Sequence, residues 1–96
     1  MNEELKKIIT TLIDKGDRNI SYYEDITLGY KWSIEKNDYT LSFDFEYWKG
    51  ADTTEYRLAL FNKNEYTMID LAENFYQSKE LDSFIKKVKE VGFING

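Results

Sequence analysis

The stretch Thr40–Trp48, TLSFDFEYW, decides the fold of this chain, because large apolar residues and polar residues alternate along it. Every second position is apolar, and the positions between hold Ser42, Asp44 and Glu46. A period of two is typical of a strand with one buried face and one exposed face. The carboxylates of Asp44 and Glu46 therefore lie on the exposed face. They could be catalytic groups, part of an acidic surface that binds a partner, or ordinary solvated residues.

The same period of two continues on both sides of this stretch. It predicts four strands, over residues 26–35, 39–47, 56–60 and 66–71. Two points stay open at the ends of this region. Ile20–Tyr23 can be a separate short strand or an early extension of the first one, and Asp70–Tyr76 can end a strand or begin a helix.

Two amphipathic helices are predicted at the ends of the chain. From Asn2 to Lys15 apolar residues recur every three or four positions, and Gly16 follows as a stop signal. A second apolar stripe begins after Ser78, a typical N-cap residue, and ends at Gly92. The order predicts one α+β domain over residues 1–96, a two-layer sandwich in which a four-stranded antiparallel meander carries both helices on its apolar face.

A two-residue turn at Asn37-Asp38 would set the register of this sheet. The predicted apolar pairs are Ile34–Leu41, Trp32–Phe43, Tyr30–Phe45, Phe43–Leu58 and Leu58–Ile69. On the other face the same register predicts a row of alternating charge made of Lys31, Asp44, Arg57 and Asp70. Cross-strand pairs of opposite charge contribute about 0.2–1 kcal/mol each to the stability of a sheet. This pattern therefore favours a structural role over a catalytic role for Asp44.

The sequence contains no Cys and no His. These absences exclude disulfides, thiol nucleophiles, Cys or His zinc sites and Ser-His-Asp triads. The net charge of −5, from 18 acidic and 13 basic residues, disfavours binding to a phosphate backbone, which needs a concentrated cationic face. The N-terminal residues MNEELKKIITTLIDKG resemble neither a signal peptide nor a membrane span. We therefore expect a cytoplasmic protein without cofactor or metal, whose partner is a protein with a basic surface.

An acidic end of the sheet is predicted around Glu46, whose cross-strand neighbours would be Gly29 and Glu55. Asp52 lies in the adjoining turn, and Trp48 breaks the alternation, so that its ring should project outward beside the carboxylates. An exposed Trp beside acids suits the recognition of a cationic side chain. The alternative is that the Trp folds over the sheet edge as a lid on the core.

A second candidate surface is predicted at the opposite end of the same face. Phe61, Tyr66 and Met68 fall on its nominally exposed side, with Ala59 beside them. Contiguous exposed apolar area usually marks an interface, so these side chains could contact a partner or a second copy of the chain. The alternative is that the fourth strand is out of register by one residue, which would turn these side chains inward.

These features favour a non-enzymatic protein-binding module, an inhibitor that occludes a basic functional surface of a nuclease or another nucleic-acid-binding protein. Small acidic inhibitors of the toxin-immunity or phage anti-defence type have this size and charge, which is an analogy and not a motif match. Two alternatives stay open, a homodimeric structural or regulatory subunit and a carboxylate-dependent hydrolase. The candidate partner-binding residues are Glu46, Trp48, Asp52, Glu55, Phe61, Tyr66 and Met68.

Overall fold

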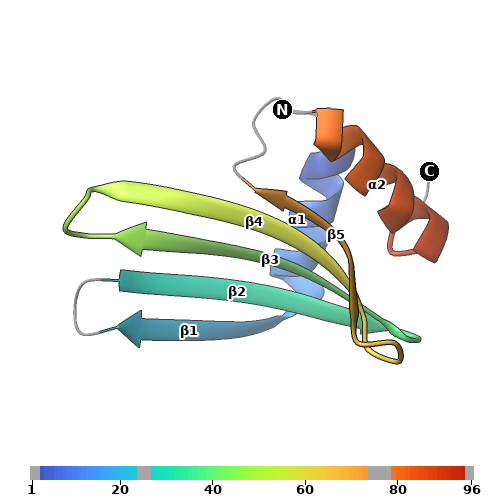
Figure 1. Ribbon diagram of the computed structural model, residues 1–96, viewed down its shortest axis with the longest axis horizontal. Coiled ribbons are helices and arrows are strands. Elements are labelled where there is room, and N and C mark those ends of the chain that lie inside the picture. Colours follow the sequence, from blue (N-terminus) through green and yellow to red (C-terminus); the bar gives the residue numbers. More distant parts are fainter. Residues whose placement is uncertain (1–2, 24–26, 74–78, 95–96) are drawn as a thin grey trace.

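The computed structural model describes residues 3–23, 27–73 and 79–94. These residues form α1 (Glu3–Lys15), β1 (Asp17–Tyr23), β2 (Thr27–Lys36), β3 (Tyr39–Trp48), β4 (Thr53–Asn62), β5 (Thr67–Glu73) and α2 (Lys79–Val91). The strands lie in sequence order in one antiparallel sheet (Figure 1). The α+β fold with an antiparallel sheet and two helices is confirmed, and the predicted number of strands is corrected from four to five.

The additional strand is β1, which settles the open point about Ile20–Tyr23. β1 pairs antiparallel with β2 along its whole length, from Asp17 opposite Ser33 to Tyr23 opposite Thr27. It begins with three polar residues, and charged or polar side chains are common on edge strands, where they discourage pairing with other chains. These polar residues interrupt the alternation of apolar and polar residues, so the sequence indicates a strand only over Ile20–Tyr23.

α1 ends at Gly16, close against the backbone of β2. The Gly16 amide donates a hydrogen bond to the Leu12 carbonyl oxygen at 2.8 Å. A Cβ atom on Gly16 would collide with this same oxygen and would lie 3.0 Å from the carbonyl oxygen of Ser33. The absence of a side chain therefore allows the chain to pass directly from the helix into β1.

α2 ends in a Schellman motif at Gly92, as the predicted stop requires. Gly92 has a φ of 93°. Its amide donates to the carbonyl oxygen of Lys89 at 3.0 Å, and the Phe93 amide donates to the carbonyl oxygen of Val88 at 3.2 Å. The Lys36 ammonium group donates to the Gly92 carbonyl oxygen at 2.7 Å, which ties the end of α2 to the end of β2. The proposed cap, Ser78, lies outside the described residues.

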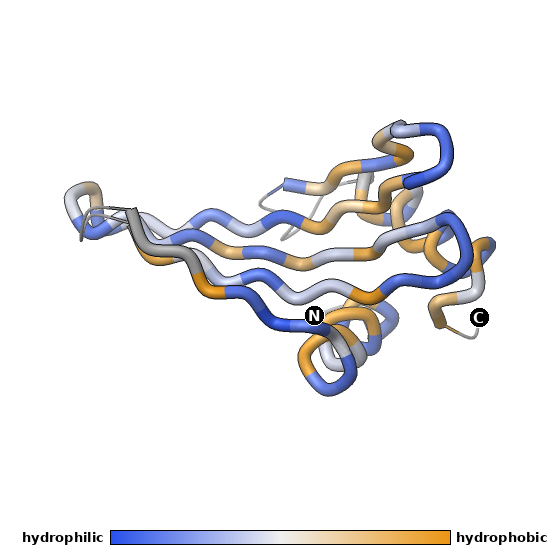
Figure 2. The backbone as a smooth tube through the Cα atoms, turned by 90° about the horizontal axis from the view of Figure 1, so that it is seen from below, coloured by the Kyte–Doolittle hydropathy of each residue, from blue (hydrophilic) through white to orange (hydrophobic). Residues whose placement is uncertain are grey.

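One hydrophobic core joins both helices to one face of the sheet. Leu41, Leu58 and Leu60 are at most 1% exposed, and they belong to the same cluster as Leu5, Ile8 and Leu12 of α1 and Leu81, Phe84, Ile85 and Val88 of α2. Hydropathy alternates along the central strands, and the end of the sheet that holds the β3–β4 turn projects beyond both helices (Figures 1 and 2). Stacked aromatic rings continue the apolar face in that direction, with Tyr30 and Phe45 centroids 5.0 Å apart.

The predicted register of the three central strands is confirmed. Asn37 and Asp38 form the two-residue connection between β2 and β3, and the Asn adopts a φ of 54°, a conformation that its short polar side chain tolerates. The confirmed apolar pairs are Ile34–Leu41, Trp32–Phe43, Tyr30–Phe45 and Phe43–Leu58. The apolar face therefore closes as predicted from β2 to β4.

A β-bulge changes the register between β4 and β5. Phe61 lies opposite Met68, whereas Leu60 lies opposite Asp70. Ile69 is therefore one extra residue on β5. Because side chains alternate with a period of two, one extra residue exchanges the faces of all positions that follow it.

Two sequence-based predictions for β5 are wrong. Leu58 lies opposite Ala72 and not opposite Ile69, because the pairing of β4 with β5 begins two residues later along β5 than predicted and the bulge adds one more residue. Asp70 is not part of the row of alternating charge, because its place opposite the buried Leu60 puts it on the helix side. There its carboxylate accepts a hydrogen bond from the Lys87 ammonium group of α2 at 3.2 Å.

The bulge also brings Glu73 opposite Arg57, in the position predicted for Asp70. β5 continues as far as Glu73, so the first part of the ambiguous segment Asp70–Tyr76 is strand. The rest of that segment lies outside the described residues.

Substitution of Gly16 by Ala tests the close approach of α1 to β2. The added methyl group meets backbone atoms that cannot rotate away, so Gly16→Ala should lower the free energy of unfolding by about 2 kcal/mol, the usual size of an overpacking penalty. Gly50→Ala is the matched control, since nothing lies within 4 Å of a Cβ atom there; it should change the stability by less than about 0.5 kcal/mol. Urea denaturation measures both, and equal losses would contradict the steric explanation.

Candidate functional site

The side of the sheet opposite the helices, here called the open face, carries rows of residues that run across the strands. From β2 to β5 the charged row consists of Lys31, Asp44, Arg57 and Glu73, and Asn19 of β1 lies opposite Lys31. From β2 to β5 the middle row beside it consists of Ser33, Ser42, Ala59 and Leu71, and Asp17 of β1 lies opposite Ser33. The next row consists of Glu35, Thr40, Phe61 and Met68. No helix covers this face among the described residues, because both helices pack on the other one.

Arg57 is the centre of the charged row. Its Nε atom lies 3.1 Å from Asp44 Oδ1 and its Nη2 atom lies 2.8 Å from Glu46 Oε1. Partial burial acts to lower the pKa of the guanidinium group, but the hydrogen bonds and charges of the two carboxylates outweigh this effect and raise it above its ordinary value. One arginine therefore holds both candidate catalytic carboxylates in ion pairs.

Glu46 differs from its expected environment. Its cross-strand neighbours are Gly29 and Glu55, as predicted. Its carboxylate is nevertheless bound, because Arg57 reaches it diagonally, from two positions further along β4. Backbone register alone does not show such diagonal contacts, since they depend on the length and rotamer of the side chain.

The projecting hairpin end of the open face presents an aromatic ring beside a carboxylate. Trp48 is 39% exposed and lies opposite Thr27 and Thr53, on the same side as Glu46 because side chains alternate along β3. Glu55 is exposed and has no ion pair within the described part of the chain. The structure therefore brings Trp48, Glu46 and Glu55 together on one face.

Asp52 does not join this group. Its Oδ1 atom accepts a hydrogen bond of 3.0 Å from the hydroxyl group of Tyr47, and Tyr47 follows the alternation of β3 to the helix side of the sheet. The hydrogen bond and the negative charge of Asp52, with a smaller effect of desolvation, raise the pKa of Tyr47 above 10.0. Asp52 has a φ of 49° and occupies the last position of the β3–β4 turn.

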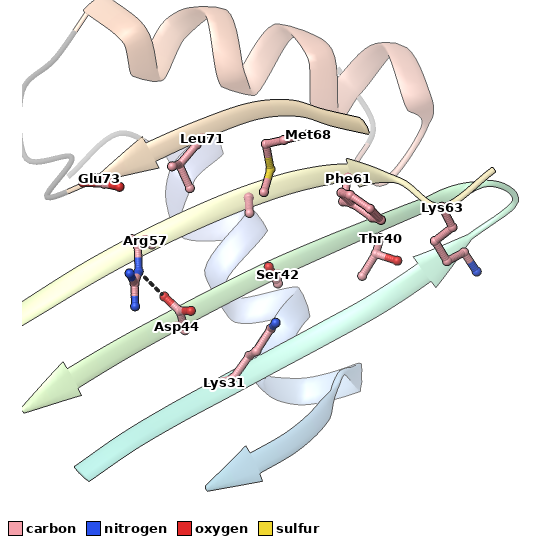
Figure 3. Close-up of a pocket in the computed structure, with 11 residues that line it drawn as sticks. Lys31, Thr40, Ser42, Asp44, Arg57, Phe61, Lys63, Met68, Leu71 and Glu73 are labelled. Atoms are coloured by element: carbon pink, nitrogen blue, oxygen red, sulfur yellow. Dashed lines mark hydrogen bonds and ion pairs between the residues drawn. The ribbon is translucent and has the colours of Figure 1, made fainter. Parts of the chain in front are cut away.

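A groove of about 610 Å³ crosses the open face at the other end (Figure 3). Phe61, Met68 and Ala59 line it, as the sequence predicted, so these side chains do not turn inward. Tyr66 is 86% exposed in the β4–β5 turn, with a φ of 54°, and does not line the groove. Leu71 lines it and was missed, because only the bulge turns this residue to the open face.

The Tyr47–Asp52 hydrogen bond gives a pH-dependent test of the hairpin end. Asp52→Asn should lower the pKa of Tyr47 toward 10.0, because the substitution removes the charged acceptor of the phenolic proton. Since the folded protein holds this pKa above the unfolded value, the bond stabilises the fold below the ordinary tyrosine pKa, and the stabilisation is lost as the pH rises through the raised value.

NMR titration of the Tyr47 ring measures this shift, with Tyr47→Phe to identify the signal. Asp38→Asn, in the β2–β3 turn, is the control and should leave the Tyr47 titration unchanged. An unchanged titration in Asp52→Asn would contradict the assigned cause of the raised pKa.

Metal ligands do not gather anywhere in residues 3–23, 27–73 and 79–94: they contain no group of three or more Asp or Glu residues placed to hold an ion. Within these ranges, neither helix is long and apolar enough to cross a membrane. The chain matches no known protein family, no curated protein and no solved structure.

Proposed function

We propose that this chain is a cytoplasmic, non-enzymatic protein-binding module that docks its projecting hairpin end onto a basic surface of a partner protein and blocks that surface. The observation that supports this proposal is that Trp48 and Glu55 are both exposed and occupy diagonal positions on the same face, on an end of the sheet that extends beyond both helices (Figure 1). A partner can approach this end without meeting α1 or α2.

The charges at the hairpin end support a cationic partner group. Glu46 and Glu55 lie directly opposite each other, and like charges in such positions repel. Arg57 neutralises Glu46 at 2.8 Å, whereas Glu55 has no such cation among the described residues. A lysine or arginine of a partner would supply the missing charge, and the ring of Trp48 would offer it a cation–π contact.

The net charge of the whole chain acts in the same direction. At −5, it speeds the diffusional encounter with a basic surface, and this electrostatic steering weakens as the ionic strength rises. Nucleases and other nucleic-acid-binding proteins carry basic functional surfaces of this kind, so occlusion of such a surface is the proposed mechanism. Toxin-immunity proteins and phage anti-defence inhibitors provide the analogy of size and charge.

Charge reversal at Glu55 tests the proposal. The immobilised protein should retain a partner from a lysate of the organism that encodes it, at low salt, and release it at high salt. Glu55→Lys should reduce the retained amount at least about tenfold, since it replaces an attraction by a repulsion of similar size. Glu90→Lys is the matched control, because it makes the same change of charge on an exposed position of α2 and should retain the partner fully.

Quantitative mass spectrometry of the retained proteins gives the readout. If both variants retain the same proteins in the same amounts as the wild type, docking through the hairpin end is wrong. If no protein is released by salt, the electrostatic mechanism is wrong.

A second candidate function is a homodimer that pairs two open faces. Met68 is 50% exposed on this face, next to the side chain of Phe61, and Tyr66 is exposed in the turn between them. Apolar contacts of this type respond little to salt. The expected result for a dimer is a concentration-dependent sedimentation coefficient that Met68→Lys abolishes, whereas a monomer at all concentrations would exclude this function.

A further inference from the structure

The groove on the open face exists because most of the middle row, Ser33, Ser42 and Ala59, has small side chains. Ser42 and Ala59 are neighbours across β3 and β4. On one side of them stand the longer side chains of the charged row, and on the other side stand Phe61 and Met68. The result is a trough across the strands that contributes to the volume of about 610 Å³, within the range of small-molecule sites.

The floor of this trough contains a polar group without a partner. Ser42 is only 9% exposed, and its hydroxyl group makes no hydrogen bond with any residue that the structure describes. Ser42 lines the groove, and Figure 3 shows its side chain within it. The hydroxyl oxygen is not one of the fully buried atoms that lack a partner, so it is accessible from the trough, and a ligand there could exchange a hydrogen bond with it.

One cation of the groove is also unpaired. Arg57 is held by Asp44 and Glu46, and Lys63 is held by Glu35 at 3.2 Å. Lys31 has no ion pair in the described part of the chain.

The ammonium group of Lys31 points across the surface toward Ser42 (Figure 3). Asp44, its neighbour in the sheet, is engaged by Arg57 instead. An ammonium group and a hydroxyl group that converge in this way form a donor pair for one anionic oxygen group.

The end of the trough at β5 is apolar. Met68 is 50% exposed and Leu71 is 39% exposed, and Phe61 and Ala59 connect them to the floor. Glu73 closes the charged row at the β5 side, where it would repel an anion. The negative group of a ligand would therefore lie at Lys31, with the apolar part toward β5.

We propose that the trough binds a small amphipathic carboxylate, a molecule with a narrow apolar body and one negative head group. The carboxylate accepts hydrogen bonds from the Lys31 ammonium group and the Ser42 hydroxyl group. The apolar body lies over Ala59 and contacts Met68 and Leu71. This site is separate from the hairpin end around Trp48 and Glu55, so it does not depend on the function proposed above.

Titration with three molecules that share one alkyl chain tests the proposal: octanoate, octanol and octylammonium. Octanoate should shift the NMR signals of the Met68 methyl group and of the Ser42 and Ala59 amides in a saturable way. Octanol should bind more weakly, since it lacks the charge, and octylammonium should bind least, because Lys31 repels it. Equal affinity for octanoate and octanol would overturn the assigned role of Lys31, and saturable shifts outside the groove, or none at all, would overturn the site.

Two variants test separately the contribution of the head-group contacts and the contribution of the space in the trough to ligand binding. Lys31→Gln should weaken octanoate binding about tenfold and leave octanol binding unchanged. Lys86→Gln, on the exposed side of α2, is the matched control and should change neither. Ala59→Leu fills the trough without removing a polar group and should abolish the binding of both molecules.

The outcomes for these variants are decisive in both directions. A native-like NMR spectrum of Ala59→Leu, together with undiminished octanoate binding, would show that the ligand does not use the trough. Glu55→Lys should bind octanoate like the wild type, so failure of the hairpin-end proposal and failure of the trough proposal give different results.

Discussion

The structure depends on one constraint, that alternate residues of the central strands face the two helices and form one core with them. Leu41, Leu58 and Leu60 are almost completely inaccessible because the two terminal helices provide the other half of a shared core. Burial of each such side chain contributes about 1.5–3 kcal/mol, which is enough to hold the strands in register. The polar residues between them are then fixed on the open face, in rows that cross the sheet.

The central part of this arrangement follows from sequence. Strict alternation in β2, β3 and β4, with a two-residue turn at Asn37-Asp38, determines which residues lie opposite each other. The pairing of Asp44 with Arg57 was predicted in this way and is confirmed. The outward position of Phe61 and Met68 was also predicted, and both line the groove.

The outer strands could not be predicted to the same extent, for two physical reasons. The polar start of β1 hides its periodicity, although its backbone pairs regularly with β2. In β5 one extra residue, Ile69, moves Asp70 to the helix side and Leu71 to the open face. Asp70 then forms an ion pair with Lys87 of α2, a contact between distant parts of the chain, and the period of two in the local sequence gives no sign of the bulge.

The connections of the sheet have a consequence for the kinetics of folding. Each strand pairs only with strands adjacent to it in the sequence, so hairpins can form one after another with little loop-closure entropy. Docking of the two helices is different, because α1 and α2 come from opposite ends of the chain and still form an ion pair through Glu4 and Lys89. Topologies dominated by local contacts reach their transition state quickly, so we expect the closure of the molecule by its two terminal helices to come after the hairpins have formed.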